Sequence, residues 1–510
     1  MDWLKENKDK IWNKSNSIIE FIIALILAVT IFSLQTEHKN GSISKISLVM
    51  SGIFIILLVG IIIYNFVKYK KDIAKLFVTC IIPIGMMYAI LVPLVKVPDE
   101  EAHIFRAYDF SCGNFITPLG EENKGEIYVP EQLLKLAQSW NKFDACRYLM
   151  AEKTDYQNLV SVDTITKTYF PINYLTGAIG FFVGRMFNIN IILMCYIIRL
   201  VNFILFILVG YYSIKMIPFG KLMLGIYMFL PMIMQQACSL SADAFINMLA
   251  ILFISYNLKL MYQESDLTLK QRLIYYIIAL SLSVCKYVYF PLTFMSLLLI
   301  KNKNISKNKK IKLILISILT SIGASVGWFV FSQKYVDLRE YIIVNNVQAI
   351  EQLKYIIKNP INYIKVFIKS LEINGESYLF GFTGNALGLL EVSIPALYII
   401  PMTFGLFITP FFEETKKTLD KYQKIIMIII GLILIALILT GLYLTFSPVG
   451  ARIIAGVQGR YFIPVYILFL LAMCLKENSI KIKNIELKYF SIYLLFNIIP
   501  ILKIITYFVQ

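Results

Sequence analysis

The chain has 510 residues, 58% of them hydrophobic, and carries a formal net charge of +17 at pH 7. No soluble core of this length could bury so much apolar surface, and repeated apolar runs of about 18–25 residues indicate a polytopic helical membrane protein. The positive charge comes from lysines in short loops between these runs, which is the pattern of cytoplasmic loops and argues against a nucleic-acid partner.

Apolar runs follow one another along most of the chain. The first one follows a lysine-rich start and lacks a small-residue cleavage site, so we expect a membrane anchor and not a removable signal. The run at 170–187 contains Pro171, Asn173 and Arg185, and the lysine-rich loops leave no place for it as a crossing. We expect an interfacial or re-entrant helix there, which leaves about 13 crossings. The runs lie at 17–35, 46–67, 75–96, 170–187, 190–213, 218–236, 239–262, 272–285, 288–300, 311–333, 393–412, 423–446, 460–475 and 488–508.

The lysine-rich loops place the N-terminus in the cytoplasm and two long polar segments outside. The chain is thereby divided into an N-terminal three-helix segment at 1–96, an outer loop at 97–187, central helices at 188–333, a second outer loop at 334–392 and C-terminal helices at 393–510. In the outer loops, Glu131–Trp140 and 341–358 are predicted to form amphipathic helices lying on the bilayer. The predicted fold class is an all-α polytopic membrane protein with interfacial helices.

The densest cluster of ionisable side chains follows the third apolar run. Three successive carboxylates, Asp99, Glu100 and Glu101, come just before His103, which is one of only two histidines in the chain. If this stretch is helical, His103 and Arg106 lie on the same face as Asp99, at spacings of four and seven residues. Such a cluster at a membrane boundary is either a solvated helix end or a reaction centre.

Further charged residues interrupt or end apolar runs, where an ionisable group is costly and usually functional. Asp243 opens a middle helix, Lys286 divides a long apolar run, and Arg452 and Arg460 lie in a late outer loop. Each has an ordinary explanation when taken alone, as a helix cap, a snorkelling lysine or a membrane anchor. Because the expected topology brings all of them to the side of the acidic cluster, we predict one polar site.

The motifs around these residues are similar to those of a known family. They are Pro98-Asp99-Glu100-x-x-His103, Ser241-x-Asp243, Lys286-x-x-Tyr289 and Gln458-Gly-Arg460-Tyr461-Phe-x-Pro464. In this order, over about residues 80–475, they resemble a large bacterial family of multi-pass membrane proteins that looks like a branch of the GT-C membrane glycosyltransferases. One departure is that three expected crossings, and not one, precede the acidic loop.

The resemblance implies transfer of a sugar, outside the cytoplasm, from a polyprenyl-phosphate donor to a glycan acceptor. Inverting transfer needs a carboxylate base for the acceptor hydroxyl and positive charge on the departing phosphate. We expect Asp99, or failing that Glu100, to be the base. The residues expected to bind substrate or phosphate are Glu101, His103, Arg106, Asp243, Lys286, Tyr287, Arg452, Arg460 and Tyr461.

The motifs point to no certain cofactor, and a divalent cation, magnesium or manganese, stays an open alternative. If a divalent cation takes part, the carboxylates Asp99 and Glu100 would suit magnesium or manganese better than zinc. No Rossmann fingerprint or P-loop is visible, so a cytoplasmic nucleotide-sugar donor is not expected. Cys112 and Cys146 are the two cysteines expected outside, where they form either a disulfide or two free thiols.

Two other classes of function stay open. A polymerase or ligase of lipid-linked oligosaccharides would share the donor lipid and the arginine-rich outer loops. A secondary transporter would also use broken helices and membrane charges, although its site would lie near the midplane between repeats, which are not visible here. The isoleucine- and lysine-rich usage resembles that of low-GC bacteria, so we expect the plasma membrane, and a wall polymer or surface polysaccharide as acceptor.

Overall fold

The computed structural model describes residues 72–117, 126–162, 164–332, 347–413, 415, 417–476 and 485–508, with scattered positions between 49 and 68. The expected crossing at 17–35 and most of the one at 46–67 lie outside these residues. Helices make up most of the described chain, and the strands form only two short two-stranded sheets.

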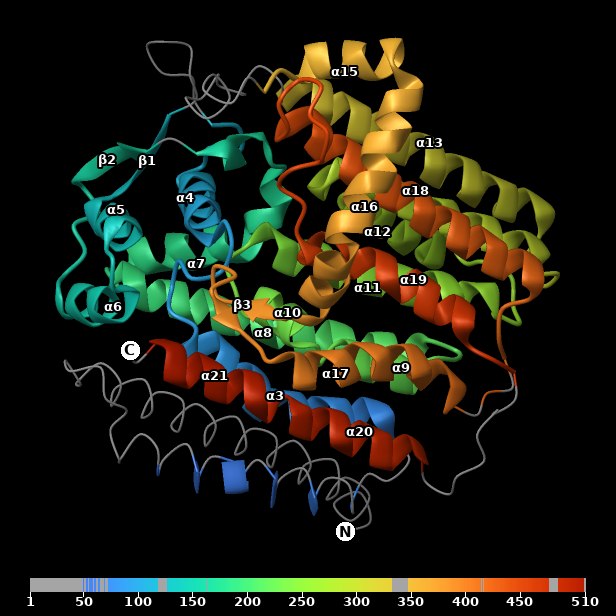
Figure 1. Cartoon of the computed structure of the whole chain (residues 1–510), viewed down its shortest axis with the longest axis horizontal. Coiled ribbons are helices and arrows are strands. Elements are labelled where there is room, and N and C mark those ends of the chain that lie inside the picture. The colour runs from blue at the N-terminus through green and yellow to red at the C-terminus, as the bar shows by residue number, and fades with distance from the viewer. Residues whose placement is uncertain are drawn as a thin grey trace.

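Three long helices form the centre of the membrane bundle: α3 (Ile73–Leu91), α8 (Ile191–Met216) and α11 (Ala242–Met261). Helices α13 (Lys307–Ser332) and α18 (Lys421–Thr445) run at the periphery, where many of their apolar side chains are exposed as they would be to lipid (Figure 1). With the C-terminal pair α20 (Ile485–Phe496) and α21 (Ile498–Phe508), six segments of the described chain are long and apolar enough to cross a membrane. The chain is thus a multi-pass membrane protein, and the larger number of about 13 crossings stays a prediction.

The expected single helix at 218–236 was wrong. The structure divides it into α9 (Lys221–Tyr227) and α10 (Pro231–Ala237), because a proline at the first position of α10 forces the preceding residue out of the helix. All of the residues of α10 are buried. This run is therefore apolar because protein surrounds it, whereas a crossing that faces lipid on one side keeps exposed apolar residues.

The run at 288–300 would be too short to cross a membrane as an α-helix, but it forms a 3-10 helix, which is longer for the same number of residues. Helix α12 (Leu269–Cys285) ends at Lys286, and a 3-10 helix, η3 (Tyr287–Lys301), continues the chain. At about 2.0 Å per residue, its 15 residues extend about 30 Å, which equals the thickness of the hydrocarbon core. Helices α13 and α18 both pack against η3.

A separate layer covers one end of the bundle (Figure 1). It holds α4 (Glu100–Ser111), the antiparallel pair β1 (Ile127–Pro130) and β2 (Leu159–Val162), with Ile127 opposite Val162, and the turns η1 (Ile165–Thr168) and η2 (Pro171–Tyr174). Helices α5 (Glu131–Gln138), α6 (Lys142–Ala151) and α7 (Leu175–Met186) complete it. With 12 residues, α7 is about 18 Å long and too short to cross, in agreement with the interpretation of 170–187.

The second long polar segment, 334–392, is also helical where the structure describes it. It contains α15 (Ala349–Lys358) and α16 (Pro360–Thr383), and a small hairpin of β3 (Ala386–Leu387) and β4 (Val392–Ser393). The remaining elements are α17 (Ala396–Ile408), η5 (Thr409–Phe411), η6 (Gly459–Phe462) and α19 (Ile463–Met473). The amphipathic helices expected near 131–140 and 341–358 correspond to α5 and α15, and α15 exposes Ile350 and Ile357 on one face.

Candidate functional site

Four charged side chains from four distant segments form one alternating row, which we call the ionic chain: Lys286, Asp243, Arg460 and Asp99. The Lys286 ammonium donates to Asp243 Oδ1 at 2.9 Å, and Arg460 Nη1 donates to Asp243 Oδ2 at 2.8 Å. Arg460 Nη2 donates to Asp99 Oδ2. The predicted convergence of these groups is therefore confirmed in space, and their formal charges cancel within the row.

Arg460 lies at the centre of the ionic chain with every nitrogen engaged. Besides the two carboxylates, Nε donates to Gln458 Oε1 at 2.7 Å, Nη1 also donates to the Pro98 carbonyl and Nη2 to the Tyr461 hydroxyl. Its side chain is only 2% exposed. A guanidinium with no donor to spare and no open surface cannot receive a phosphate as expected, so its role is to hold the two carboxylates in place.

The glycine before this arginine is required by packing. A Cβ built on Gly459 would lie 2.3 Å from the carbonyl carbon of Gly381 and 2.2 Å from the nitrogen of Phe382, both backbone atoms of α16. Backbone atoms cannot move aside as a flexible side chain can. Gly459 therefore lets η6 lie directly against α16, which fixes the start of the segment that carries Arg460.

Asp99 is the most exposed member of the ionic chain. It caps the N-terminus of α4 with a left-handed backbone, φ 62°, and its side chain is 45% exposed, compared with 9% for Asp243 and 17% for Lys286. A carboxylate that is oriented by a buried arginine on one oxygen and open on the other side suits a base that must meet a substrate.

Lys286 is the cation that a ligand can reach. It lies at the break between α12 and η3, and its ammonium lies 4.8 Å from the ring centroid of Tyr461 and 5.6 Å from that of Tyr289. Its three N–H groups can make more bonds than the one to Asp243. Lys286 is thus better placed than Arg460 to meet an anion.

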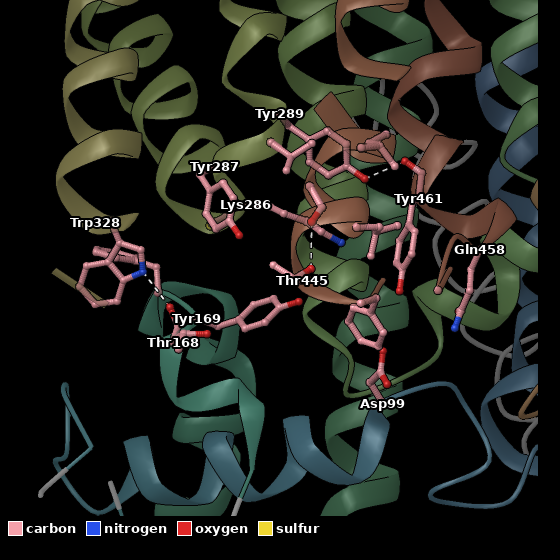
Figure 2. A pocket seen from close by; sticks show the side chains of 18 of the residues that line it. Asp99, Thr168, Tyr169, Lys286, Tyr287, Tyr289, Trp328, Thr445, Gln458 and Tyr461 are labelled. Atoms are coloured by element: carbon pink, nitrogen blue, oxygen red, sulfur yellow. Dashed lines mark hydrogen bonds between the residues drawn. The ribbon is translucent and has the colours of Figure 1, made fainter. Parts of the chain in front are cut away.

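Asp99 and Lys286 open into the same cavity of about 270 Å³ (Figure 2). The cavity lies between α13 and α18, over the break between α12 and η3. Aromatic side chains dominate its walls, while Gln458, Thr168 and Thr445 supply polar atoms. The aromatic residues are Tyr169, Phe170, Tyr287, Tyr289, Trp328, Phe446 and Tyr461.

Two hydrogen bonds fix this aromatic wall (Figure 2). The Trp328 indole N–H donates to the Thr168 carbonyl at 2.9 Å, which joins α13 to η1 in the layer that also holds α4. The Tyr289 hydroxyl donates to the Tyr461 carbonyl at 2.8 Å, which joins η3 to η6. On the opposite wall, Gly441 leaves open space, since an added Cβ would meet no atom within 4 Å. Rigid aromatic rings around a few polar groups are typical of a small-molecule site.

Glu100, expected as the alternative base, points away from the cavity and is fully buried. Arg199 on α8 donates to it twice, from Nε at 2.9 Å and Nη2 at 2.5 Å. The backbone amides of Val95 and Leu240 donate to the same carboxylate at 2.9 and 3.0 Å. With four donors and no exposure, Glu100 cannot serve as the base.

The same divergence bears on the divalent cation that Asp99 and Glu100 would hold if one takes part. The carboxylates of Asp99 and Glu100 are engaged by different arginines, so they do not converge on one point. Within the described residues, no group of three or more His, Cys, Asp or Glu side chains is arranged to hold a metal ion. Asp99 and Glu100 therefore do not fit magnesium or manganese.

His103 lies behind the cavity wall and not in it. Its Nδ1 lies 2.8 Å from the Tyr174 hydroxyl, and its ring packs edge-on against Tyr169 at 5.4 Å. Burial lowers the pKa of His103 to about 4, although the nearby Asp99 and Asp243 act in the opposite direction. A neutral His103 therefore supports Tyr169 and has no charge to offer a phosphate.

Arg106 and Glu101 also fail to reach the cavity. Arg106 is buried, pairs with Asp109 at 2.7 Å and donates to the carbonyls of Asn114 and Phe115 at 3.1 and 2.7 Å. It holds the end of α4. Glu101 faces Lys142, and burial raises the pKa of Glu101, an effect that the lysine partly offsets.

Of the remaining residues expected in the site, some line the cavity and others do not. Tyr287 and Tyr461 line the cavity, whereas Arg452 is exposed and is not among the cavity-lining residues. Cys112 and Cys146 are free thiols in the structure, so the disulfide expected as one alternative is not formed. Cys146 is buried, while Cys112 is exposed beside Arg185.

Several residues of the site were not expected from the sequence. Tyr169 and Trp328 are uncharged, and nothing in their local pattern separates them from other residues of apolar or loop segments. Gln458 begins one of the quoted motifs, but no role in the site was predicted for it. Arg199 did carry a signal, because an arginine in the middle of an apolar run is costly and needs a partner. Its fully buried carboxylate partner, Glu100, is the explanation.

Residues 80–469 match the model of a family described as "Predicted membrane protein (DUF2142)". This match covers the ionic chain and the whole cavity wall. No curated protein matches the chain, and no solved structure does.

Proposed function

We propose that the chain, which belongs to this family of predicted membrane proteins, is a GT-C-like membrane glycosyltransferase of the plasma membrane. It would move a sugar from a polyprenyl-phosphate donor to a wall polymer or surface polysaccharide outside the cytoplasm, with inversion at the sugar. One observation carries the proposal: a half-exposed carboxylate, Asp99, and a reachable cation, Lys286, open into the same aromatic cavity.

The proposed reaction assigns one role to each of these groups. Asp99 accepts the proton of the acceptor hydroxyl as that oxygen forms its bond to the anomeric carbon. The bond from that carbon to the phosphate oxygen breaks, and the electron pair leaves with the phosphate. Lys286 stabilises the charge that develops on the phosphate. Arg460 touches neither substrate and holds Asp99 and Asp243 in position.

The position of the cavity in the bundle supports a lipid-linked donor. Its walls come from α13 and α18, the peripheral helices that expose many apolar side chains. The outward face of η3 between them is also apolar, with Tyr287 and Ile300 exposed and Phe290, Phe294 and Leu297 partly so. A donor could therefore keep its hydrocarbon chain in the bilayer while its phosphate meets Lys286.

The contents and size of the cavity favour a single sugar unit. Tyrosine and tryptophan rings present flat apolar surfaces with polar edges, which match the alternating faces of a sugar ring. A volume of about 270 Å³ falls just below the range of about 300–1,000 Å³ for drug-sized ligands. This size argues for a monosaccharide donor and against the polymerase or ligase alternative, which would handle a longer glycan.

Reconstitution tests the proposal directly. The purified full chain in liposomes would be given a short-chain polyprenyl phosphate carrying one radiolabelled hexose, with cell-wall fragments as acceptors, and transfer would be measured. Transfer that requires Asp99 supports the proposal, and Glu101→Gln is the matched control because that carboxylate faces Lys142. Lipid flipping across the bilayer without any transfer would instead point to a transporter.

A further inference from the structure

Glu100, the residue that follows the proposed base, belongs to a fully buried ion pair. Glu100 and Arg199 are both 0% exposed, and Arg199 uses its remaining donors on three carbonyls at the end of α3. These carbonyls belong to Ala89, Val92 and Pro93, at 3.3, 2.5 and 3.0 Å. The pair therefore joins α8 to the point where the chain leaves α3, just before Asp99.

The segment that the pair holds has an unusual backbone. Val95 and Asp99 both have positive φ angles, 65° and 62°, which are rare for residues other than glycine and rarer still for a β-branched valine. The Val95 amide donates to Glu100 Oε2 at 2.9 Å, so the carboxylate directly stabilises one of the two strained residues. Strained backbone of this kind persists only where surrounding contacts enforce it, and it gathers at functional sites.

The other Glu100 oxygen contacts the backbone of the segment that carries Asp243, the second carboxylate of the ionic chain. Glu100 Oε1 accepts from the Leu240 amide at 3.0 Å, and Leu240 lies three residues before Asp243. Ser241 then caps α11 by accepting from the Asp243 amide. One buried carboxylate thus contacts both of the segments that present Asp99 and Asp243.

We propose that Glu100 and Arg199 are positioning residues, which set the spacing of Asp99 and Asp243 around Arg460 and act on catalysis only through them. A buried ion pair is weak evidence for stability, because desolvation of the two charges offsets much of their attraction. This pair instead fixes the relative positions of three segments, because a planar guanidinium and a carboxylate join them at fixed angles. The proposal deepens the proposed function and rests on it.

Arg199→Lys tests the proposal, because it keeps the charge and removes the fork that binds Glu100 and the carbonyls together. We expect turnover to fall by about 10²-fold, the effect of a misplacement near 1 Å, while binding of a short-chain polyprenyl phosphate to Lys286 changes little. Arg106→Lys is the matched control, since Arg106 is a buried arginine on α4 that also bridges a carboxylate and two carbonyls, toward the end of that helix away from Asp99. It should keep the wild-type rate.

A second measurement does not need the enzyme reaction. Hydrogen exchange should speed up in peptides covering 92–100 and 238–243 in Arg199→Lys, and stay unchanged in α18. If exchange and the ratio of turnover to donor binding both stay at wild-type values, the positioning role is refuted. A parallel loss of turnover, donor binding and folded protein would also refute it, in favour of a purely structural pair. If the wild-type protein transfers no sugar, the proposed function fails, and the exchange data alone then decide whether the pair holds the two segments.

Discussion

The substitution Asp99→Asn separates catalysis from folding at this site more cleanly than any other. Asparagine keeps the size of the side chain, tolerates the left-handed backbone at this position and still offers an oxygen to Arg460. The lost ion pair joins a buried arginine to a side chain that is 45% exposed. A charged hydrogen bond contributes about 1.5–3 kcal/mol when buried and less when solvent screens it, so we expect about 1 kcal/mol of destabilisation.

The effect on the reaction should be much larger. Removal of a general base lowers turnover by about 10²–10⁴-fold, which corresponds to about 2.7–5.4 kcal/mol in the activation free energy. The assay is transfer of labelled sugar by the reconstituted protein, with thermal unfolding in detergent measured on the same preparation. Near wild-type turnover in Asp99→Asn would refute the role of Asp99. An equal loss of turnover in Glu101→Gln would also refute this role, because Glu101 does not face the cavity.

Three further perturbations follow from the geometry. Lys286→Ala should weaken binding of a short-chain polyprenyl phosphate by about ten- to over a hundredfold, as loss of a charged hydrogen bond does, and unchanged affinity would move the phosphate elsewhere. Gly441→Leu should fill the cavity without a clash and abolish transfer in a folded protein, whereas Gly323→Leu, equally open on α13 but not lining the cavity, should leave transfer unchanged in the same assay. Because the folded pKa of His103 lies at about 4, below the unfolded value near 6.5, the unfolded chain binds more protons between these values, and stability falls as pH decreases through that window. His103→Gln should remove up to about 2.4 kcal/mol of this dependence, measured as the difference in the free energy of unfolding between pH 7 and pH 4.5. An unchanged difference would show that other groups cause the dependence.

The sequence predicted that the four members of the ionic chain meet, because an ionisable group in an apolar run is expensive unless it has a partner or a task. It also placed Arg452 with them, whereas Arg452 is exposed and does not line the cavity. It could not predict where each one points. His103 and Arg106 were expected on the face of Asp99 by helical spacing, but Asp99 is the left-handed cap of α4 and does not follow the helix register. Its carboxylate therefore enters the cavity while Arg106 turns to Asp109 and Glu100 turns to Arg199.

The membrane segments show the same limit. Hydropathy cannot tell a run that faces lipid from one surrounded by protein, which is why 218–236 looked like a crossing although the structure breaks it at Pro231. It also cannot show that the short run after Lys286 is a 3-10 helix, whose larger rise gives 15 residues the length of a crossing. In both cases long-range packing, which no local pattern records, decides the outcome.

The formal charges of the ionic chain cancel, and this balance gives a physical reason for pairing the proposed base with an arginine. Before the reaction, two carboxylates balance two cations, and a donor phosphodiester adds a single negative charge. As the sugar leaves, the phosphate gains a second negative charge, and Asp99 loses its own by taking the acceptor proton. The total charge of this partly buried site therefore stays constant, which avoids the high cost of building up charge where the dielectric is low. Arg460, no longer paired with a charged Asp99, keeps its ion pair with Asp243, while Lys286 faces the more negative phosphate.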